Sequence, residues 1–141
     1  MNALFVGGPD LATRSRDGRN FVLIEAKCIR TETALYRMPA GSVSDGASTP
    51  EPLWSLGLAP FGVYWPAAFA HDCAYRGTLQ VQSGMEWIPA NLTKAESDDL
   101  LSALMFSLGV VDKDRITIYE GVHLAGWKAF REDRQVQSAV S

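Results

Sequence analysis

The sequence predicts an α+β fold in which a small antiparallel sheet at the N-terminus is followed by a long loop and then three helices. Short apolar runs with β-branched residues fill the first part, whereas capping patterns and helical apolar spacing fill the second. With 141 residues, 47% of them hydrophobic and 21% charged, the chain is expected to form a single domain, 1–141. We divide it into a β region (1–40), a loop (41–66), a helical core (66–132) and a tail (133–141).

The β region contains strand candidates of unequal strength. Residues 4–6 and 11–14 are weak candidates, whereas residues 21–29 are rich in Val, Ile and Phe and form the most convincing one. Asp17-Gly18 supplies the positive-φ glycine that a tight hairpin turn favours. Residues 34–38 are expected to pair with residues 21–29 across a polar turn, giving an antiparallel hairpin.

The loop and the first helix follow. Proline, glycine and tryptophan are frequent in residues 41–66 and periodicity is weak, which is typical of a long functional loop. Proline fits the first position of a helix, so Trp65-Pro66 is expected to begin a helix that Gly77 ends. An irregular connection with a short strand near residues 86–88 comes next.

Two further helices are expected after this connection. Thr93 and Glu96 form a capping-box pattern that predicts the start of the second helix. Apolar residues then repeat at helical spacing, which gives this helix one buried stripe, and Gly109 is expected to end it. A third helix is expected over residues 113–132, followed by a polar, unstructured tail.

The charge and the cysteine count exclude several classes of protein. The net charge is −3 and the basic residues are scattered, so nucleic acid is not an expected partner. We expect no signal peptide and no transmembrane segment, because no run approaches the roughly 18 apolar residues of a membrane span. Cys28 and Cys73 are too few for a disulfide framework, so synthesis in a reducing cytoplasm is expected, with a single bridge the less favoured alternative.

The candidate catalytic residues are His71, Tyr75 and Asp98. His71 and Tyr75 are one turn apart and share a helix face, whereas the adjacent Asp72 points about 100° away. A histidine base needs an acceptor that orients its other ring nitrogen. Asp98 falls on the buried stripe of the second helix, where a carboxylate is costly unless it is paired. We therefore predict a hydrogen bond between Asp98 and His71, with Tyr75 joining it.

Asp72 and Asp45 are the candidate metal ligands. Two carboxylates with loop carbonyls suit calcium, which could stabilise an oxyanion while His71 activates a water. Simpler alternatives stay open: His71-Asp72 as a solvated or structural pair, Asp45 as a turn residue, and Asp98 as a first-turn carboxylate favoured by the helix dipole. His123 is interpreted as a packing or surface residue, which leaves too few histidines for a zinc hydrolase.

Several motifs occur together in this chain, in order. They are Pro39-Ala40-Gly41, the turn Ser44-Asp45-Gly46-Ala47-Ser48-Thr49-Pro50, Ala67-Ala68, His71-Asp72, Tyr75, Thr93, Glu96, Asp98, Gly109-Val110 and Tyr119. This set resembles a small family of uncharacterised proteins from tailed phages and prophages over about residues 20–130. The resemblance implies a protein made in the host cytoplasm and found in the virion or its tail, with other phage structural proteins or a second copy as partners.

The Asp45-Gly46 loop, the His71-Asp72-x-x-Tyr75 helix and Asp98 also resemble, more distantly, the phospholipases A(2) of the short bacterial and fungal type. That resemblance implies a phospholipase A(2)-like helical core in which His71 is the general base, Asp72 and Asp45 bind calcium, and Asp98 orients the histidine. The expected function is therefore a virion or tail-associated protein built on such a core, with a structural or accessory role in particle assembly or host entry. The alternative is an active calcium-dependent phospholipase or esterase that acts on host envelope lipid or on another ester or amide bond.

Overall fold

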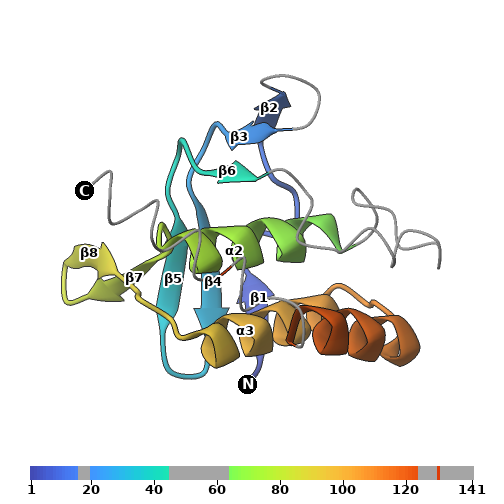
Figure 1. The fold of residues 1–141 in the computed structure, drawn as a ribbon. Helices are drawn as coiled ribbons and strands as arrows, with labels where there is room; N and C mark the ends of the chain where they lie inside the picture. The colour runs from blue at the N-terminus through green and yellow to red at the C-terminus, as the bar shows by residue number, and fades with distance from the viewer. Residues whose placement is uncertain (16–19, 45–63, 124–129, 131–141) are drawn as a thin grey trace.

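The computed structural model describes residues 1–15, 20–44, 64–123 and 130. Within these residues, eight strands form two antiparallel sheets, and the N-terminal strands precede the helices (Figure 1). The predicted α+β class is therefore confirmed. The predicted turn at residues 17–18, most of the predicted loop and the predicted tail lie outside the described residues.

The larger sheet has five strands and the smaller has three. The five-stranded sheet has the order β1 (Ala3–Phe5), β4 (Lys27–Thr31), β5 (Leu35–Met38), β7 (Gln80–Ser83) and β8 (Glu86–Pro89). The three-stranded sheet has the order β2 (Thr13–Ser15), β3 (Phe21–Leu23) and β6 (Val43–Ser44). The predicted hairpin is present in the pairing of β4 with β5, in which Cys28 lies opposite Arg37.

The prediction of one strand over residues 21–29 was wrong. The run is divided between the two sheets: β3 pairs with β2 and β6, and β4 pairs with β1 and β5. Residues 24–26 between them are exposed, and the Ile24 amide donates to the Ala12 carbonyl as the chain changes sheets. The apolar composition of the run was a sound indication of strand, but composition carries no information on which neighbour each half meets.

Two strands were not predicted. β6 lies at the start of the predicted loop, and β7 lies in the predicted irregular connection, where it forms a hairpin with β8 around Gly84. Both are short, and their pairing is with segments distant in sequence, β3 for the first and β5 for the second. Local pattern alone does not reveal such strands.

The helices begin and end close to where local chemistry predicts. α2 (Trp65–Arg76) has Pro66 in its first turn, and Gly77 closes it with φ 75° in the left-handed region. α3 (Lys94–Ser107) begins at a complete capping box between Thr93 and Glu96. The third predicted helix is present over residues 112–123 and at Phe130 of the described chain.

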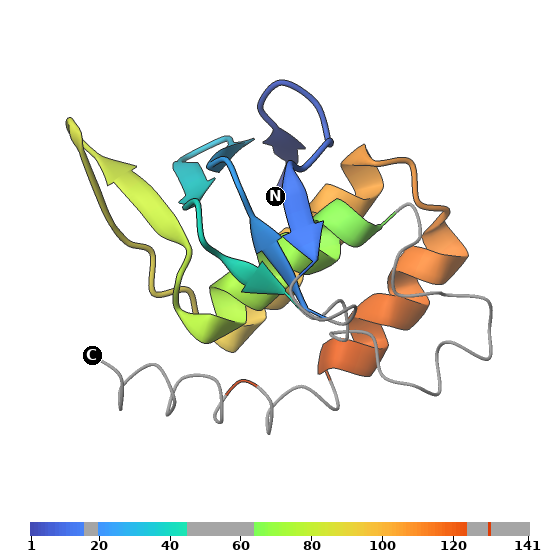
Figure 2. The ribbon, with the colours of Figure 1, turned by 90° about the horizontal axis from the view of Figure 1, so that it is seen from above.

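The helices pack on the sheets and on one another (Figures 1 and 2). α2 contacts α3 and β6, and α3 contacts β1. The side chains between them are fully buried, among them Ile29, Phe69 and Leu104. Trp65 makes edge-to-face contacts with Phe21 of the small sheet and with Phe69, so the start of α2 is fixed against that sheet. None of the described helices is long and apolar enough to span a membrane.

Candidate active site

The candidate active site is centred on the carboxylate of Asp98, which is fully buried between α2 and α3. Its Oδ1 lies 2.8 Å from His71 Nε2 and accepts a hydrogen bond of 2.6 Å from the Tyr75 hydroxyl. Its Oδ2 accepts a hydrogen bond of 2.7 Å from Lys94 Nζ. The predicted contacts of Asp98 with His71 and Tyr75 are present.

Helical periodicity places these four side chains. His71 and Tyr75 are four residues apart on α2, so both project from one face, and their ring centroids are 4.0 Å apart. Lys94 and Asp98 have the same spacing at the start of α3. Because α2 packs against α3, the two pairs face each other and form one polar network inside an otherwise apolar contact.

The network keeps Asp98 ionised. Burial raises the pKa of this carboxyl, but the hydrogen bonds from His71, Lys94 and Tyr75 outweigh burial and lower the pKa to about 2. A carboxylate only accepts hydrogen bonds, so we assign the shared proton to His71 Nε2. In a neutral imidazole, the other nitrogen, Nδ1, then carries the lone pair.

Lys94 is the member of the network that sequence reasoning missed. It is not among the candidate site residues of the sequence analysis, yet its side chain is 2% exposed. Nζ donates to Asp98 Oδ2 and, over 2.9 Å, to the carbonyl oxygen of His123. The available signal was its position one turn before Asp98, because a buried carboxylate needs a partner and a lysine at that spacing can supply it.

His123 was interpreted as a packing or surface residue, and its side chain is indeed 49% exposed. It is nevertheless close to the network, because Nδ1 lies 3.5 Å from Asp98 Oδ2. The ring stacks on Tyr119, whose hydroxyl donates to Asp99 over 3.0 Å. Residues 112–123 thus lie beside two adjacent carboxylates of α3, and Tyr119 is hydrogen-bonded to the exposed one, Asp99.

Of the two predicted metal ligands, only Asp72 lies within the described residues; Asp45 lies outside them. The Asp72 carboxylate is 7% exposed and accepts a hydrogen bond from the Ser44 hydroxyl at the end of β6. Arg76 holds the same strand by donating to the Val43 carbonyl over 2.7 Å. Asp45 is therefore the next residue in sequence after Ser44, which contacts Asp72.

The donors near Asp72 have the right chemistry for calcium but are too few by themselves. Calcium prefers oxygen ligands and takes about six to eight of them. The described residues place one carboxylate, Asp72, and one hydroxyl, Ser44, together, and they contain no group of three or more His, Cys, Asp or Glu side chains suited to a metal. The other ligands would have to come from residues after Ser44, which lie outside the described residues, and from water.

The two cysteines are free thiols, so the less favoured disulfide is not formed. Cys73 lies next to the site in sequence but is fully buried, and burial raises its pKa to about 12. A thiol with that pKa is neutral and unreactive at ordinary pH. Cys73 is therefore a packing residue of α2.

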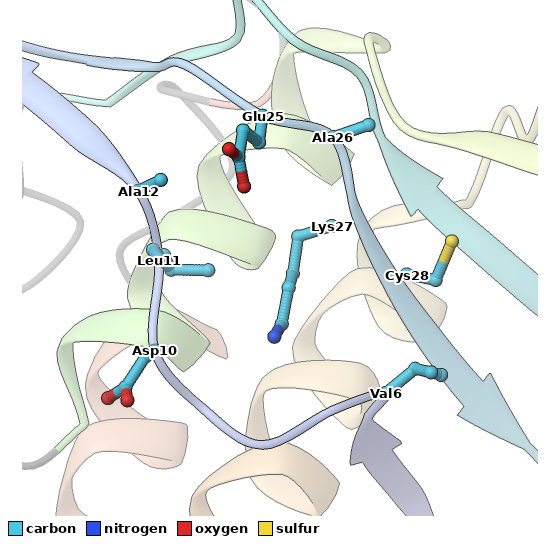
Figure 3. A pocket seen from close by; sticks show the side chains of 8 residues that line it. All are labelled: Val6, Asp10, Leu11, Ala12, Glu25, Ala26, Lys27 and Cys28. Atoms are coloured by element: carbon cyan, nitrogen blue, oxygen red, sulfur yellow. The ribbon is translucent and has the colours of Figure 1, made fainter.

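A concavity lies apart from this network, between the strand connections at residues 6–12 and 25–28 (Figure 3). It has a volume of about 530 Å³. The Lys27 side chain projects into it, with the carboxylates of Asp10 and Glu25 on its sides (Figure 3). Its lining shares no residue with the Asp98 network, and no sequence pattern pointed to it.

The fold and the network define a mixed α+β protein in which a polar centre of His, Asp, Tyr and Lys is buried between two helices that pack on antiparallel sheets. The chain belongs to the family described as "Protein of unknown function (DUF1353)", whose model matches residues 21–122. The match includes α2, α3 and the four buried network residues, and it ends one residue before His123. No curated protein and no solved structure matches this chain.

Proposed function

We propose that this chain is a hydrolase that uses His71 as a general base to activate water against a phospholipid or another ester. The observation that carries the proposal is the contact of His71 Nε2 with Asp98 Oδ1 at 2.8 Å. That contact directs the lone pair of the imidazole to Nδ1 and provides the orienting carboxylate that a catalytic histidine needs.

The reaction requires two proton movements at His71. Nδ1 takes a proton from the water as its oxygen attacks the carbonyl carbon, and the nearby Asp98 anion stabilises the imidazolium that forms. When the tetrahedral intermediate collapses, the C–O bond to the leaving group breaks and Nδ1 returns the proton to the leaving oxygen. The products are a carboxylic acid and an alcohol.

Asp72 is placed for a different task, because it lies outside the Asp98 network and contacts Ser44. We propose that Asp72 and Ser44, with Asp45 and its loop, hold a calcium ion. Calcium bound there would supply positive charge for the developing oxyanion.

Access to His71 requires movement of the chain that covers it. The side chain is 1% exposed, so water and an ester reach Nδ1 only in an opened form of the site. Several enzymes open to admit substrate and close around it, and closure excludes bulk water from the reaction.

Hydrolysis of a panel of phospholipids, with calcium and with a chelator, tests this proposal. The wild-type protein should release fatty acid only with calcium, and His71→Ala should reduce the rate by at least about a hundredfold, because it removes the base. Circular dichroism of the variant provides the control for folding. Equal rates for wild type and His71→Ala would remove the hydrolase proposal.

We also propose that the chain is associated with the particle of a tailed phage, with a structural or accessory role in assembly or host entry. The motif resemblance is what supports this role. Its partners would be other phage structural proteins or a second copy of the chain. Mass spectrometry of purified particles that does not detect the chain would remove this role, whatever the outcome of the lipid assay.

A further inference from the structure

We propose that Lys94 is a positioning residue for the reaction at His71: it fixes the Asp98 carboxylate so that His71 carries its lone pair on Nδ1. This inference rests on the hydrolase function proposed above. No motif or resemblance pointed to Lys94; it follows from the contacts of the buried network.

The first argument is the division of partners between the two oxygens of Asp98. Oδ1 receives Tyr75 and contacts His71 Nε2, whereas Oδ2 receives Lys94 and has His123 Nδ1 at 3.5 Å. With partners on both sides, the carboxylate plane cannot turn without breaking at least one charge-assisted hydrogen bond. Lys94 therefore helps to fix the plane of the carboxylate relative to His71.

The second argument concerns the charge of Asp98, which is 0% exposed. Burial favours the neutral carboxyl, and the buried Lys94 ammonium is in contact with it at 2.7 Å. Without that cation, Asp98 takes up a proton from solvent more readily, and its neutral form becomes more populated. A protonated carboxyl donates a hydrogen bond, so His71 Nε2 would become the acceptor and the proton would move to Nδ1. The base would then have lost its lone pair at the reacting position.

The third argument is that Lys94 occupies an unfavourable place for a cation. It is the first residue of α3, where the positive end of the helix dipole opposes a positive charge, and its ammonium is buried. The bonds to Asp98 Oδ2 and to the His123 carbonyl offset both costs. The second bond also ties the carboxylate to residues 112–123, so the orientation of Asp98 depends on that helical segment.

The test is a measurement of the His71 tautomer in Lys94→Met, with Lys94→Arg as the charge-retaining variant and the exposed Lys113→Met as the matched control. The chain has two histidines, so long-range ¹H–¹⁵N spectra contain two rings, and His123→Gln identifies which signals belong to His71. The spectra are recorded as a pH series from mildly acid to alkaline, because protonation of Asp98 is favoured as the pH falls. The tautomer is read from the signals of the neutral imidazole. Lipid hydrolysis is measured on the same samples.

Wild type, Lys94→Arg and Lys113→Met should show His71 protonated on Nε2, whereas Lys94→Met should show a large fraction protonated on Nδ1. For Lys94→Met, kcat should fall at least about tenfold with little change in KM, because the substitution misplaces the reacting group and leaves the contacts with the lipid unchanged. A Lys94→Met protein that keeps the Nε2 tautomer overturns the proposal, even if the protein is less stable.

Two further arms separate the possible failures. If Lys94→Met does not fold, the His71 tautomer is measured in Lys94→Gln, which keeps a hydrogen-bond donor without the charge. A Lys94→Gln protein that keeps the Nε2 tautomer overturns the proposal in the same way. If no sample, wild type included, hydrolyses lipid, the hydrolase proposal fails, while the tautomer still shows whether Lys94 sets the state of His71.

Discussion

Two groups of charged side chains in this molecule contain the same residue types in opposite surroundings. In the Asp98 network, Lys94 is 2% exposed and its ammonium lies 2.7 Å from a fully buried carboxylate. In the concavity of Figure 3, Lys27 is half-buried between the exposed residues Asp10 and Glu25. No ion pair joins Lys27 to either carboxylate in the described part of the chain.

The difference shows what burial does to a lysine and a carboxylate. In the open concavity water solvates each charge, and pairing would gain only about 0–1 kcal/mol. Between α2 and α3 water is excluded, so an unpaired charge would cost several kcal/mol, and pairing is required for the helices to pack. Residues of the same type therefore need not have the same role, because the packing around each residue determines whether its charge must be paired.

The largest effect that would distinguish the two regions is expected for Asp98→Ala. This change leaves the Lys94 ammonium buried without its carboxylate, and it should lower the free energy of unfolding by about 3–5 kcal/mol in urea titrations. The neighbouring Asp99→Ala is the matched control. Asp99 is exposed and loses only the Tyr119 hydrogen bond, so about 1 kcal/mol or less is expected. Similar losses for both variants would contradict the comparison.

Tyr75→Phe should have the next largest effect. It removes a hydroxyl that donates to a buried anion over 2.6 Å, and such bonds contribute roughly 1.5–3 kcal/mol. Tyr36→Phe serves as the control, because the Tyr36 hydroxyl makes no hydrogen bond with the described residues. Equal melting temperatures for the two variants would show that the Tyr75 hydrogen bond does not stabilise the fold.

The stability of the fold should depend on acid pH through Asp98. Its pKa is lowered from 3.8 to about 2, so the unfolded chain binds the proton more readily. The stabilisation is fully present well above the unfolded pKa and is lost as the pH falls through about 2, a change of about 2 kcal/mol for this one group. In Asp98→Asn this part of the pH dependence of the urea midpoint should be missing. An unchanged acid dependence would argue against an ionised Asp98.

The smallest effect is expected in the open concavity. Lys27→Met removes a half-buried charge that makes no ion pair with the described residues, and the free energy of unfolding should change by less than about 0.5 kcal/mol. Lys94→Met, measured beside it by the same urea titration, should lose several times more. Equal effects would show that the two lysines are not in different environments.

The sequence predicted features that depend on local chemistry. Pro66 and Gly77 delimit α2, and the capping box at Thr93 begins α3, because each acts within one helical turn. The contact of Asp98 with His71 was also predictable, since helical spacing placed the carboxylate on a buried stripe where it needed a partner.

The features that were missed depend on segments distant in sequence. The division of residues 21–29 between two sheets is set by β2 and β6 on one side and by β1 and β5 on the other. The burial of Lys94 likewise requires the carbonyl of His123, which only the packing of residues 112–123 brings within 2.9 Å. Such partners have no signature in the local pattern around the residue itself.

The most direct test of the central claim, that Asp98 orients His71 for catalysis, compares the lipid hydrolysis rates of Asp98→Asn and Asp99→Asn. Both are measured with calcium on samples that circular dichroism shows to be folded. In Asp98→Asn the new amide can act as a donor to His71 and so favour the wrong tautomer, and kcat should fall on the order of 10²–10⁴-fold. Asp99→Asn should stay within about twofold of wild type, because Asp99 is exposed and lies outside the network. Equal rates for the two variants would contradict the claim.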